Sequence, residues 1–203
     1  MRKNPFLALL ATLACAPLAT PGLAATPPAA DAVSGPSYLD GRLELPQDYR
    51  QWVYLTSGFD MSYVAGQAPD HHMFDNVFDD PASWRAFQAS GTWPDKTMLV
   101  LEQRGARGRG SINQAGRYQD TDVMGVEVHV KDTARFPEQW GFFAFGDKAP
   151  ARRIPASAEC YSCHQAHAAV DTTFVQFYPT LLPLAIAKGT LSAGYAADEK
   201  THP

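Results

Sequence analysis

The most regular alternation of apolar and polar positions lies between residues 124 and 130. The apolar positions in this segment are Met124, Val126, Val128 and Val130. Because successive side chains of a strand point to opposite faces, this period of two predicts a β-strand with one buried face. Glu127 and His129 occupy the intervening positions and are expected to point outward.

Three other apolar segments have the length and composition of strands, at residues 72–79, 97–102 and 139–146. In the first of them, Phe74 and Phe78 lie two pleats apart and share a face. The last contains Phe142 among several other aromatic residues. Strands that follow one another along the chain across loops favour an antiparallel sheet.

Two segments carry the signals of helices. A helix is expected from Pro46 to Gly58, because apolar residues recur there at helical spacing, at Tyr49, Trp52 and Val53. A second helix is predicted to begin at Pro81, with Asp80 as its N-cap, and to end near Gly91. Helices beside a mainly antiparallel sheet define the α+β class, which is the fold class that this chain predicts.

The first 25 residues have the pattern of a secretory signal peptide. Arg2 and Lys3 precede an apolar stretch, and small residues follow it near Ala24. We therefore expect an exported, periplasmic protein, and no apolar run is long enough to span a membrane. The expected organisation is a signal peptide at 1–25, a flexible lead-in at 26–37, one folded domain at 38–190 and a tail at 191–203.

The charge of the chain narrows the choice of partner. The chain has 17 basic and 21 acidic residues, a formal net charge of −4, and the signal peptide carries two of the basic residues and no acidic one. A mildly acidic surface argues against nucleic acid or an anionic membrane as the partner. A basic redox protein is compatible with this charge.

The strongest chemical signal is the segment Cys160-Tyr161-Ser162-Cys163-His164, which reads C-x-x-C-H. This is the attachment signal for c-type haem, in which two thiols bond to the porphyrin and the imidazole becomes an axial iron ligand. On a helix, Cys160 and His164 share a face, and Cys163 lies beside them. The segment predicts one covalent haem c, attached through Cys160 and Cys163 and ligated by His164.

Two other interpretations of C-x-x-C are a redox-active cysteine pair and half of a zinc site. A thioredoxin-like pair belongs to an early strand-to-helix turn, whereas this pair comes late in the chain. A zinc site needs further ligands, and the only other cysteine, Cys15, lies in the expected signal peptide. Attachment of haem c takes place outside the bacterial cytoplasm, which agrees with export.

Several segments together resemble the cytochrome P-460 family. C-x-x-C-H at 160–164 is followed by Asp-Thr-Thr-Phe-Val-Gln-Phe-Tyr-Pro at 171–179, and matching segments precede it at residues 45–50, 91–95, 125–132 and 140–145. The resemblance identifies the domain at 38–190 as a haem domain of this type. It implies a mainly antiparallel sheet with helices, a C-terminal haem-binding helix and often a homodimer.

The resemblance also bears on activity. Named members of the family oxidise hydroxylamine with a haem cross-linked to a lysine, whereas a sister branch, cytochrome c-prime beta, lacks the cross-link and binds small gases such as nitric oxide. By this resemblance Leu101 stands where the lysine should be, and leucine has no nitrogen that could bond the porphyrin. Lys96 lies five residues earlier, and strand alternation places it on the opposite face.

The same resemblance implies a five-coordinate iron with an apolar distal pocket. The candidates for its lining are Leu101 and one or more of Phe74, Phe78 and Phe142, and the alternative for each is an ordinary core residue. Glu127 matches a family position expected to face the distal side, where its carboxylate would accept protons from a nitrogen-oxide substrate. The alternative for Glu127 is an ordinary solvent-facing strand residue. Asp171 is a candidate either to fix the backbone after the haem-binding helix or to hydrogen-bond the imidazole of His164. The candidate sixth ligands are Met61, Met73, Met98, Met124, His71, His72 and His129.

Three functions follow from these residues. The first is a gas-binding cytochrome, the second is an enzyme that oxidises hydroxylamine or a related nitrogen compound, and the third is a simple electron carrier. Leu101 argues against the second function. The third is weakened because no methionine follows His164 in the chain.

Overall fold

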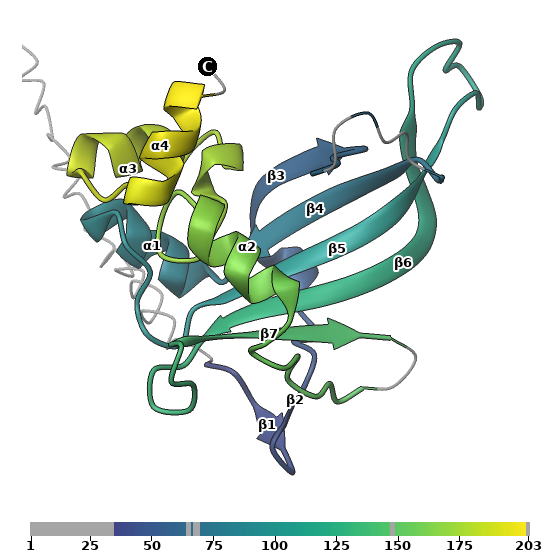
Figure 1. Ribbon diagram of the computed structural model, residues 1–203. Helices are drawn as coiled ribbons and strands as arrows, with labels where there is room; N and C mark the ends of the chain where they lie inside the picture. Colours follow the sequence, from purple (N-terminus) through teal and green to yellow (C-terminus); the bar gives the residue numbers. More distant parts are fainter. Residues whose placement is uncertain (1–34, 64–65, 67–69, 147–148, 202–203) are drawn as a thin grey trace, which may run out of the picture. The chain divides into compact units, whose positions relative to one another are not determined.

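The computed structural model describes residues 35–63, 66, 70–146 and 149–201, and a five-stranded antiparallel sheet forms its centre (Figure 1). The strands pair in chain order and are β3 (Val53–Phe59), β4 (Met73–Asp79), β5 (Met98–Arg107), β6 (Tyr118–Lys131) and β7 (Trp140–Phe145). This confirms the predicted strands and their antiparallel pairing. The expected signal peptide and most of the lead-in at 26–37 lie outside the described residues.

One face of the sheet carries the alternating valines of β6. They form a hydrophobic core with residues of β5 and β7, namely Met98, Val100, Phe143 and Phe145. The segment before β3 covers this face through β1 (Tyr38–Leu39), β2 (Arg42–Leu43) and the 3-10 helix η1 (Tyr49–Gln51). Its contribution to the core is Leu43, Tyr49 and Trp52.

The opposite face of the sheet packs against helices (Figure 1). These are α1 (Pro81–Ser90), α2 (Glu159–His167), the 3-10 helix η2 (Val175–Phe177), α3 (Leu182–Lys188) and α4 (Ala193–Thr201). Leu55, Leu99 and Trp140 of the sheet join Phe87 and Leu181 in a second core. The α+β class and the late C-terminal helix are confirmed. None of the helices that the structure describes is long and apolar enough to cross a membrane.

The ends of α1 agree with the sequence signals. The Asp80 carboxylate accepts hydrogen bonds from the backbone N–H groups of Ala82 and Ser83, at 3.1 and 2.9 Å. Gly91 ends the helix with φ +77°, a left-handed conformation that glycine adopts without strain. The Gly91 N–H donates to the Phe87 carbonyl at 2.7 Å, so α1 is capped at both ends.

The helix expected from Pro46 to Gly58 is wrong. Only Tyr49–Gln51 are helical, in one 3-10 turn, and β3 begins two residues later at Val53. Tyr49 and Trp52 both enter the first core from this turn. Apolar residues three apart fit one helical turn as well as a long helix, so this short pattern could not separate the two.

The segment expected as a tail, 191–203, contains α4, which packs on α2. The Ser192 hydroxyl donates to the Ala168 carbonyl at 2.6 Å, and Tyr195 is buried. Gly194 lies so near the Ala166 carbonyl that a Cβ at this position would come within 2.1 Å of its oxygen. The close approach fixes α4 against the end of α2.

Candidate functional site

The cysteines and the histidine of C-x-x-C-H lie on α2, as predicted. Cys160, Cys163 and His164 are each partly buried, whereas Ser162 between them is exposed. The two cysteines are free thiols. Positions three and four apart on a helix are neighbours, so the three side chains lie on the side of α2 that turns towards the protein.

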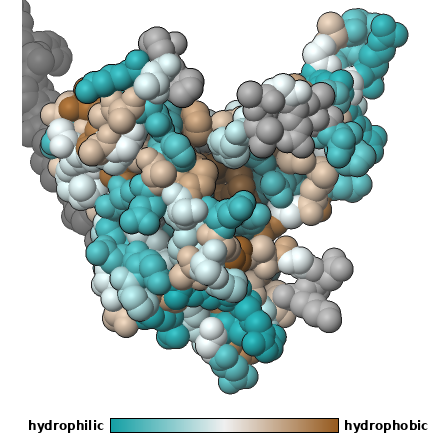
Figure 2. Space-filling view, viewed as in Figure 1, coloured by the Kyte–Doolittle hydropathy of each residue, from teal (hydrophilic) through white to brown (hydrophobic). Residues whose placement is uncertain are grey.

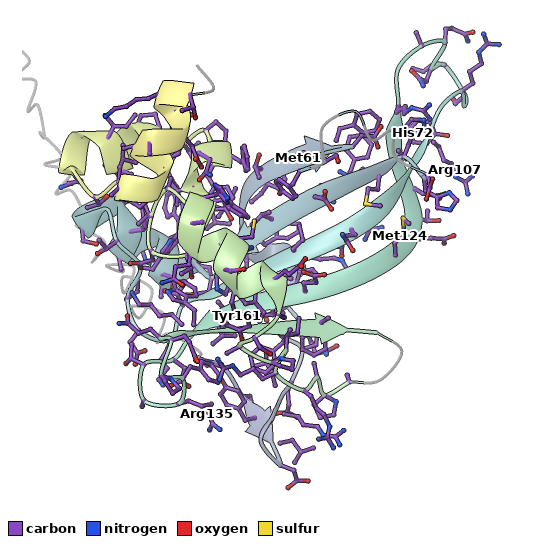
Figure 3. All side chains as sticks on the ribbon, in the orientation of Figure 1. Met61, His72, Arg107, Met124, Arg135 and Tyr161 are labelled. Carbon is purple, nitrogen blue, oxygen red and sulfur yellow. The ribbon has the colours of Figure 1, made fainter. Side chains whose placement is uncertain are left out.

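Tyr161 fastens α2 to the edge of the sheet (Figure 3). Its hydroxyl accepts hydrogen bonds from the Phe142 N–H at 3.2 Å and from Arg153 Nε at 3.1 Å. It donates to the Ile154 carbonyl at 3.1 Å. The Tyr161 ring also meets the Phe142 ring edge-on, with centroids 4.7 Å apart. One side chain of the C-x-x-C-H segment therefore sets the position of α2 on β7.

The His164 imidazole is held by a backbone carbonyl. Its Nδ1 lies 2.7 Å from the Thr172 carbonyl oxygen, which can only accept, so Nδ1 carries the hydrogen. Burial lowers the pKa of His164, which favours the neutral ring. In this tautomer Nε2 has a free lone pair, as an axial iron ligand requires.

Asp171 does not contact the His164 ring in this way. Its carboxylate forms an ion pair with Lys131 Nζ at 2.9 Å, and its backbone is left-handed with φ +53°. Asp171 therefore ties the segment after α2 to β6, and the next residue, Thr172, provides the hydrogen-bond acceptor for His164.

A cavity of about 360 Å³ opens beside His164, between the helices and the sheet. The space-filling view shows a hollow in this region with hydrophobic residues at its floor (Figure 2). The apolar lining comes from both layers and includes Val77, Leu99, Leu101, Phe142, Phe174 and Phe177. Phe142 and Phe174 also contact the His164 ring, at centroid distances of 4.6 and 4.1 Å. The volume lies within the usual range of cofactor sites.

Phe74 and Phe78 do not line this cavity, contrary to expectation. Both rings lie on the other face of β4, where Phe78 contacts Tyr49 and Phe74 contacts Phe59. The residues of β4 that reach the cavity are the odd-numbered ones, among them Asp75 and Val77. A pleated strand cannot present positions 74 and 75 to the same side, and the sequence did not indicate which side faced the cavity.

One wall of the cavity is polar, in contrast to the expected apolar pocket. Glu127 faces the cavity from β6, directly opposite Leu101, and Asp75 faces it from β4, directly opposite Gln103. Burial, and then the charge of Asp75, raise the pKa of Glu127. Burial also raises the pKa of Asp75, whose Oδ1 has no hydrogen-bond partner among the described residues. Of the two interpretations of Glu127, the structure agrees with a carboxylate that faces the cavity rather than one on the solvent side.

His129 is the cavity residue whose position sequence reasoning missed. It was expected to point outward, but it is 8% exposed and lies under α2. Its ring stacks on Phe142 with centroids 3.9 Å apart and meets the His164 ring edge-on at 5.3 Å. Burial lowers the pKa of His129 well below the usual value, so the ring is neutral. The alternation along β6 is confirmed, but α2 covers the face on which His129 lies.

The structure separates the other candidate iron ligands. Met61 and Met73 line the cavity, and Met61 lies just after β3 (Figure 3). Met98 is buried in the first core, whereas Met124 is 50% exposed and is not part of the core. His71 and His72 are exposed, and His72 pairs with Asp60 at 2.5 Å. His129 stands in edge contact with His164, which leaves no room for a porphyrin between the two rings.

The residues at this cavity fit a haem group. Two free thiols and a neutral imidazole with an available Nε2 come from one helix, and apolar side chains line the adjoining cavity. Thioether attachment and axial imidazole ligation need this donor set. A second hollow of about 640 Å³, between β1, β2 and residues 150–153, is lined mostly by polar groups and contains none of these donors.

The sequence comparisons agree with the chemistry of this site. The chain matches the family model Cytochrome P460 over residues 46–175, a range that begins before η1 and includes the whole sheet, α2 and Thr172. Comparison with curated proteins gives no match. The matched range is more than half of the chain, and this chain accordingly belongs to the cytochrome P460 family, whose members are c-type haem proteins.

Proposed function

We propose that this chain is an exported mono-haem cytochrome that binds a small gaseous ligand such as nitric oxide. In this proposal Cys160 and Cys163 attach the haem, and His164 is the single protein ligand of the iron. The observation that carries the proposal is the hydrogen bond from His164 Nδ1 to the Thr172 carbonyl, which leaves Nε2 free beside the cavity.

The haem would supply an iron centre that binds neutral diatomic molecules. The chain's own residues decide what reaches this centre. Leu99, Leu101 and Phe142 line part of the cavity with apolar groups, which accept a small neutral ligand without a desolvation cost. The carboxylates of Glu127 and Asp75 lie in the same cavity and disfavour the entry of anions when they are charged.

An optical experiment on the purified, exported protein tests this proposal. We expect a mass increase of one haem that the double variant Cys160→Ser/Cys163→Ser lacks. We also expect a high-spin ferrous spectrum that shifts on addition of carbon monoxide or nitric oxide. Ser162→Ala is the matched control, because this exposed residue lies between the two cysteines. A low-spin spectrum that neither gas changes would contradict gas binding and favour the electron carrier, with Met61 or Met73 as the sixth ligand.

A second candidate function is the oxidation of hydroxylamine or a related nitrogen compound. The observation that favours it is the position of Glu127, whose carboxylate faces the cavity and would accept protons that such a substrate loses. Leu101 argues against it, because this side chain lines the cavity where the resemblance places a cross-linking lysine. A tryptic peptide joined to haem through a lysine, or turnover of hydroxylamine that Glu127→Gln abolishes, would support the second function over the first.

A further inference from the structure

The surroundings of His129 differ from those of an ordinary core histidine. Its ring is buried between the sheet and α2, in contact with three aromatic rings, those of Trp140, Phe142 and His164. The stacking on Phe142 is nearly parallel, at 14°, so the plane of the His129 ring is defined. The contact with His164 is nearly perpendicular, at 78°. The His129 ring therefore borders one side of the His164 imidazole.

Thr172 connects the two histidines by a second route. Its carbonyl oxygen accepts the hydrogen bond from His164 Nδ1 at 2.7 Å, while its hydroxyl oxygen lies 3.3 Å from His129 Nε2. The flanking residues are also held. Val170 and Thr173 exchange backbone hydrogen bonds, and Asp171 pairs with Lys131. The contact between the Thr172 hydroxyl and His129 thus joins residues 170–173 to β6 at a second point, beside the ion pair of Asp171.

We propose that His129 is a positioning residue for the haem ligand His164 and acts through Thr172. This inference rests on the proposed function, because it requires His164 to ligate the iron. The hydrogen bond at the second ring nitrogen of a ligating histidine sets the orientation and basicity of the imidazole. Through its contact with the Thr172 hydroxyl, His129 keeps the Thr172 carbonyl aligned with His164 Nδ1.

The consequence appears in the reduction potential of the iron. A well-aligned Nδ1–H···O=C bond makes the imidazole a stronger electron donor, which stabilises ferric iron. Loss of the His129–Thr172 contact weakens this alignment. The potential then rises, and in the ferrous protein the iron–histidine stretching frequency falls. A residue that only filled space would change the stability and leave both quantities unchanged.

The test compares pairs of variants in the haem-loaded protein. Thr172→Val removes the hydroxyl and keeps the carbonyl, whereas Thr172→Ser keeps both. His129→Phe keeps a ring, whereas His129→Gln keeps a polar atom near the position of Nε2. We expect Thr172→Val and His129→Phe to raise the reduction potential of the iron. Thr172→Ser and His129→Gln should keep a potential close to that of the wild type. The double variant Thr172→Val/His129→Phe should shift no further than either single variant, because both remove the same contact.

Val130→Ala serves as the control for loss of packing, because Val130 lies on β6 but faces the other core. It should lower the melting temperature and leave the potential unchanged. Equal potentials in Thr172→Val, Thr172→Ser and the wild type would overturn the inference while leaving the proposed function intact. A His164→Ala protein with the wild-type spectrum would instead refute ligation by His164, and the inference would fall with it. If His129→Phe does not fold, the comparison of Thr172→Val with Thr172→Ser still tests the inference.

Discussion

Two buried carboxylates on the sheet have opposite environments. Glu102 on β5 is 2% exposed and receives hydrogen bonds from Tyr49, Arg50 and Arg104. Burial opposes its ionisation, but these hydrogen bonds outweigh burial and lower the pKa of Glu102. Asp79 on β4 is fully buried, and neither of its carboxylate oxygens has a hydrogen-bond partner among the described residues. Burial, followed by the charge of Asp80, raises the pKa of Asp79 well above its usual range.

Replacing Glu102 with glutamine should destabilise the fold. The change removes the buried charge to which Tyr49, Arg50 and Arg104 donate, and the loss of hydrogen bonds to a charged group costs about 1.5–3 kcal/mol. Urea denaturation of the variant measures this loss. Glu138→Gln is the control, because Glu138 pairs with Arg153 but its side chain is 43% exposed. We expect the control to lose much less stability than Glu102→Gln, because an exposed ion pair contributes little. Equal losses in both variants would contradict the role given to burial.

The replacement Asp79→Asn should stabilise the protein at neutral pH. The folded protein retains a proton on Asp79 that the unfolded chain releases at its usual pKa of about 3.9. The stability of the wild type therefore falls as the pH rises from about 4 towards the raised folded pKa. The variant lacks this loss, which amounts to about 1.4 kcal/mol for each unit of pKa shift.

Urea denaturation between pH 4 and pH 7 checks this difference. The free energies of unfolding of the two proteins should agree near pH 4. As the pH rises, that of the wild type should fall below that of the variant. Asp95→Asn offers a control of opposite sign. The Thr133 N–H donates to Asp95, whose pKa is lowered, so this variant should lose stability above pH 4. Parallel curves for Asp79→Asn and the wild type would show that Asp79 titrates normally.

At the scale of elements, α1 and α2 are held in place by different means. The N-cap of α1 is the Asp80 side chain, whereas Ala158 at the start of α2 provides no side-chain cap. The position of α2 depends instead on Tyr161 and its three hydrogen bonds to β7 and residues 153–154. A helix that presents cysteines and a histidine to a cavity needs a defined position, and Tyr161 provides it from within the C-x-x-C-H segment.

Tyr161→Phe should therefore destabilise the attachment of α2. The variant leaves the Phe142 N–H and the Ile154 carbonyl without their partner, at a cost of about 1–3 kcal/mol. Thermal unfolding measures the loss, and hydrogen exchange at the Phe142 amide should become faster. Tyr54→Phe is the matched control, since Tyr54 is 55% exposed and packs on Phe78 through its ring. Unchanged exchange at Phe142 in Tyr161→Phe would rule out this anchoring role.

At the scale of the whole molecule, one sheet separates two cores. The first core lies under β1, β2 and η1, and the second lies under the helices. Both cores use side chains of the same strands, in alternation, as Val100 and Leu99 show on β5. Loss of either core exposes one face of the shared sheet. We therefore expect the described domain to unfold in a single transition.

A pair of substitutions tests this cooperativity. Val130→Ala removes a fully buried side chain from the first core, and Leu181→Ala removes one from the second. We expect the free energy of unfolding to fall by about 1–2 kcal/mol in Val130→Ala and by about 3 kcal/mol in Leu181→Ala. Each variant should still unfold in one sharp transition. Ile186→Ala, at a residue that is 57% exposed, should cost less than about 1 kcal/mol. Separate transitions in tryptophan fluorescence and far-ultraviolet circular dichroism would show that the two cores unfold independently.

Local signals in the sequence accounted for most of the fold. The period of two identified β6, and Asp80 with Gly91 identified the ends of α1, because backbone geometry and capping act over a few neighbouring residues. The pattern at Tyr49 and Trp52 misled because it extended over a single turn. Exposure could not be read in this way, since Met124 continues the apolar alternation of β6 but lies in the mostly exposed first half of this strand (Figure 3).

The same distinction between local signals and tertiary contacts applies to the site. The sequence by itself determined the thiols and the imidazole of C-x-x-C-H, because their spacing places them on one side of any helix. Only the tertiary structure decided which side of each strand meets α2. That choice brought Glu127, Asp75 and His129 to the cavity side and left Phe74 and Phe78 on the other. The physical reason is that alternation defines two faces of a strand, whereas the helices that cover one of them come from distant parts of the chain.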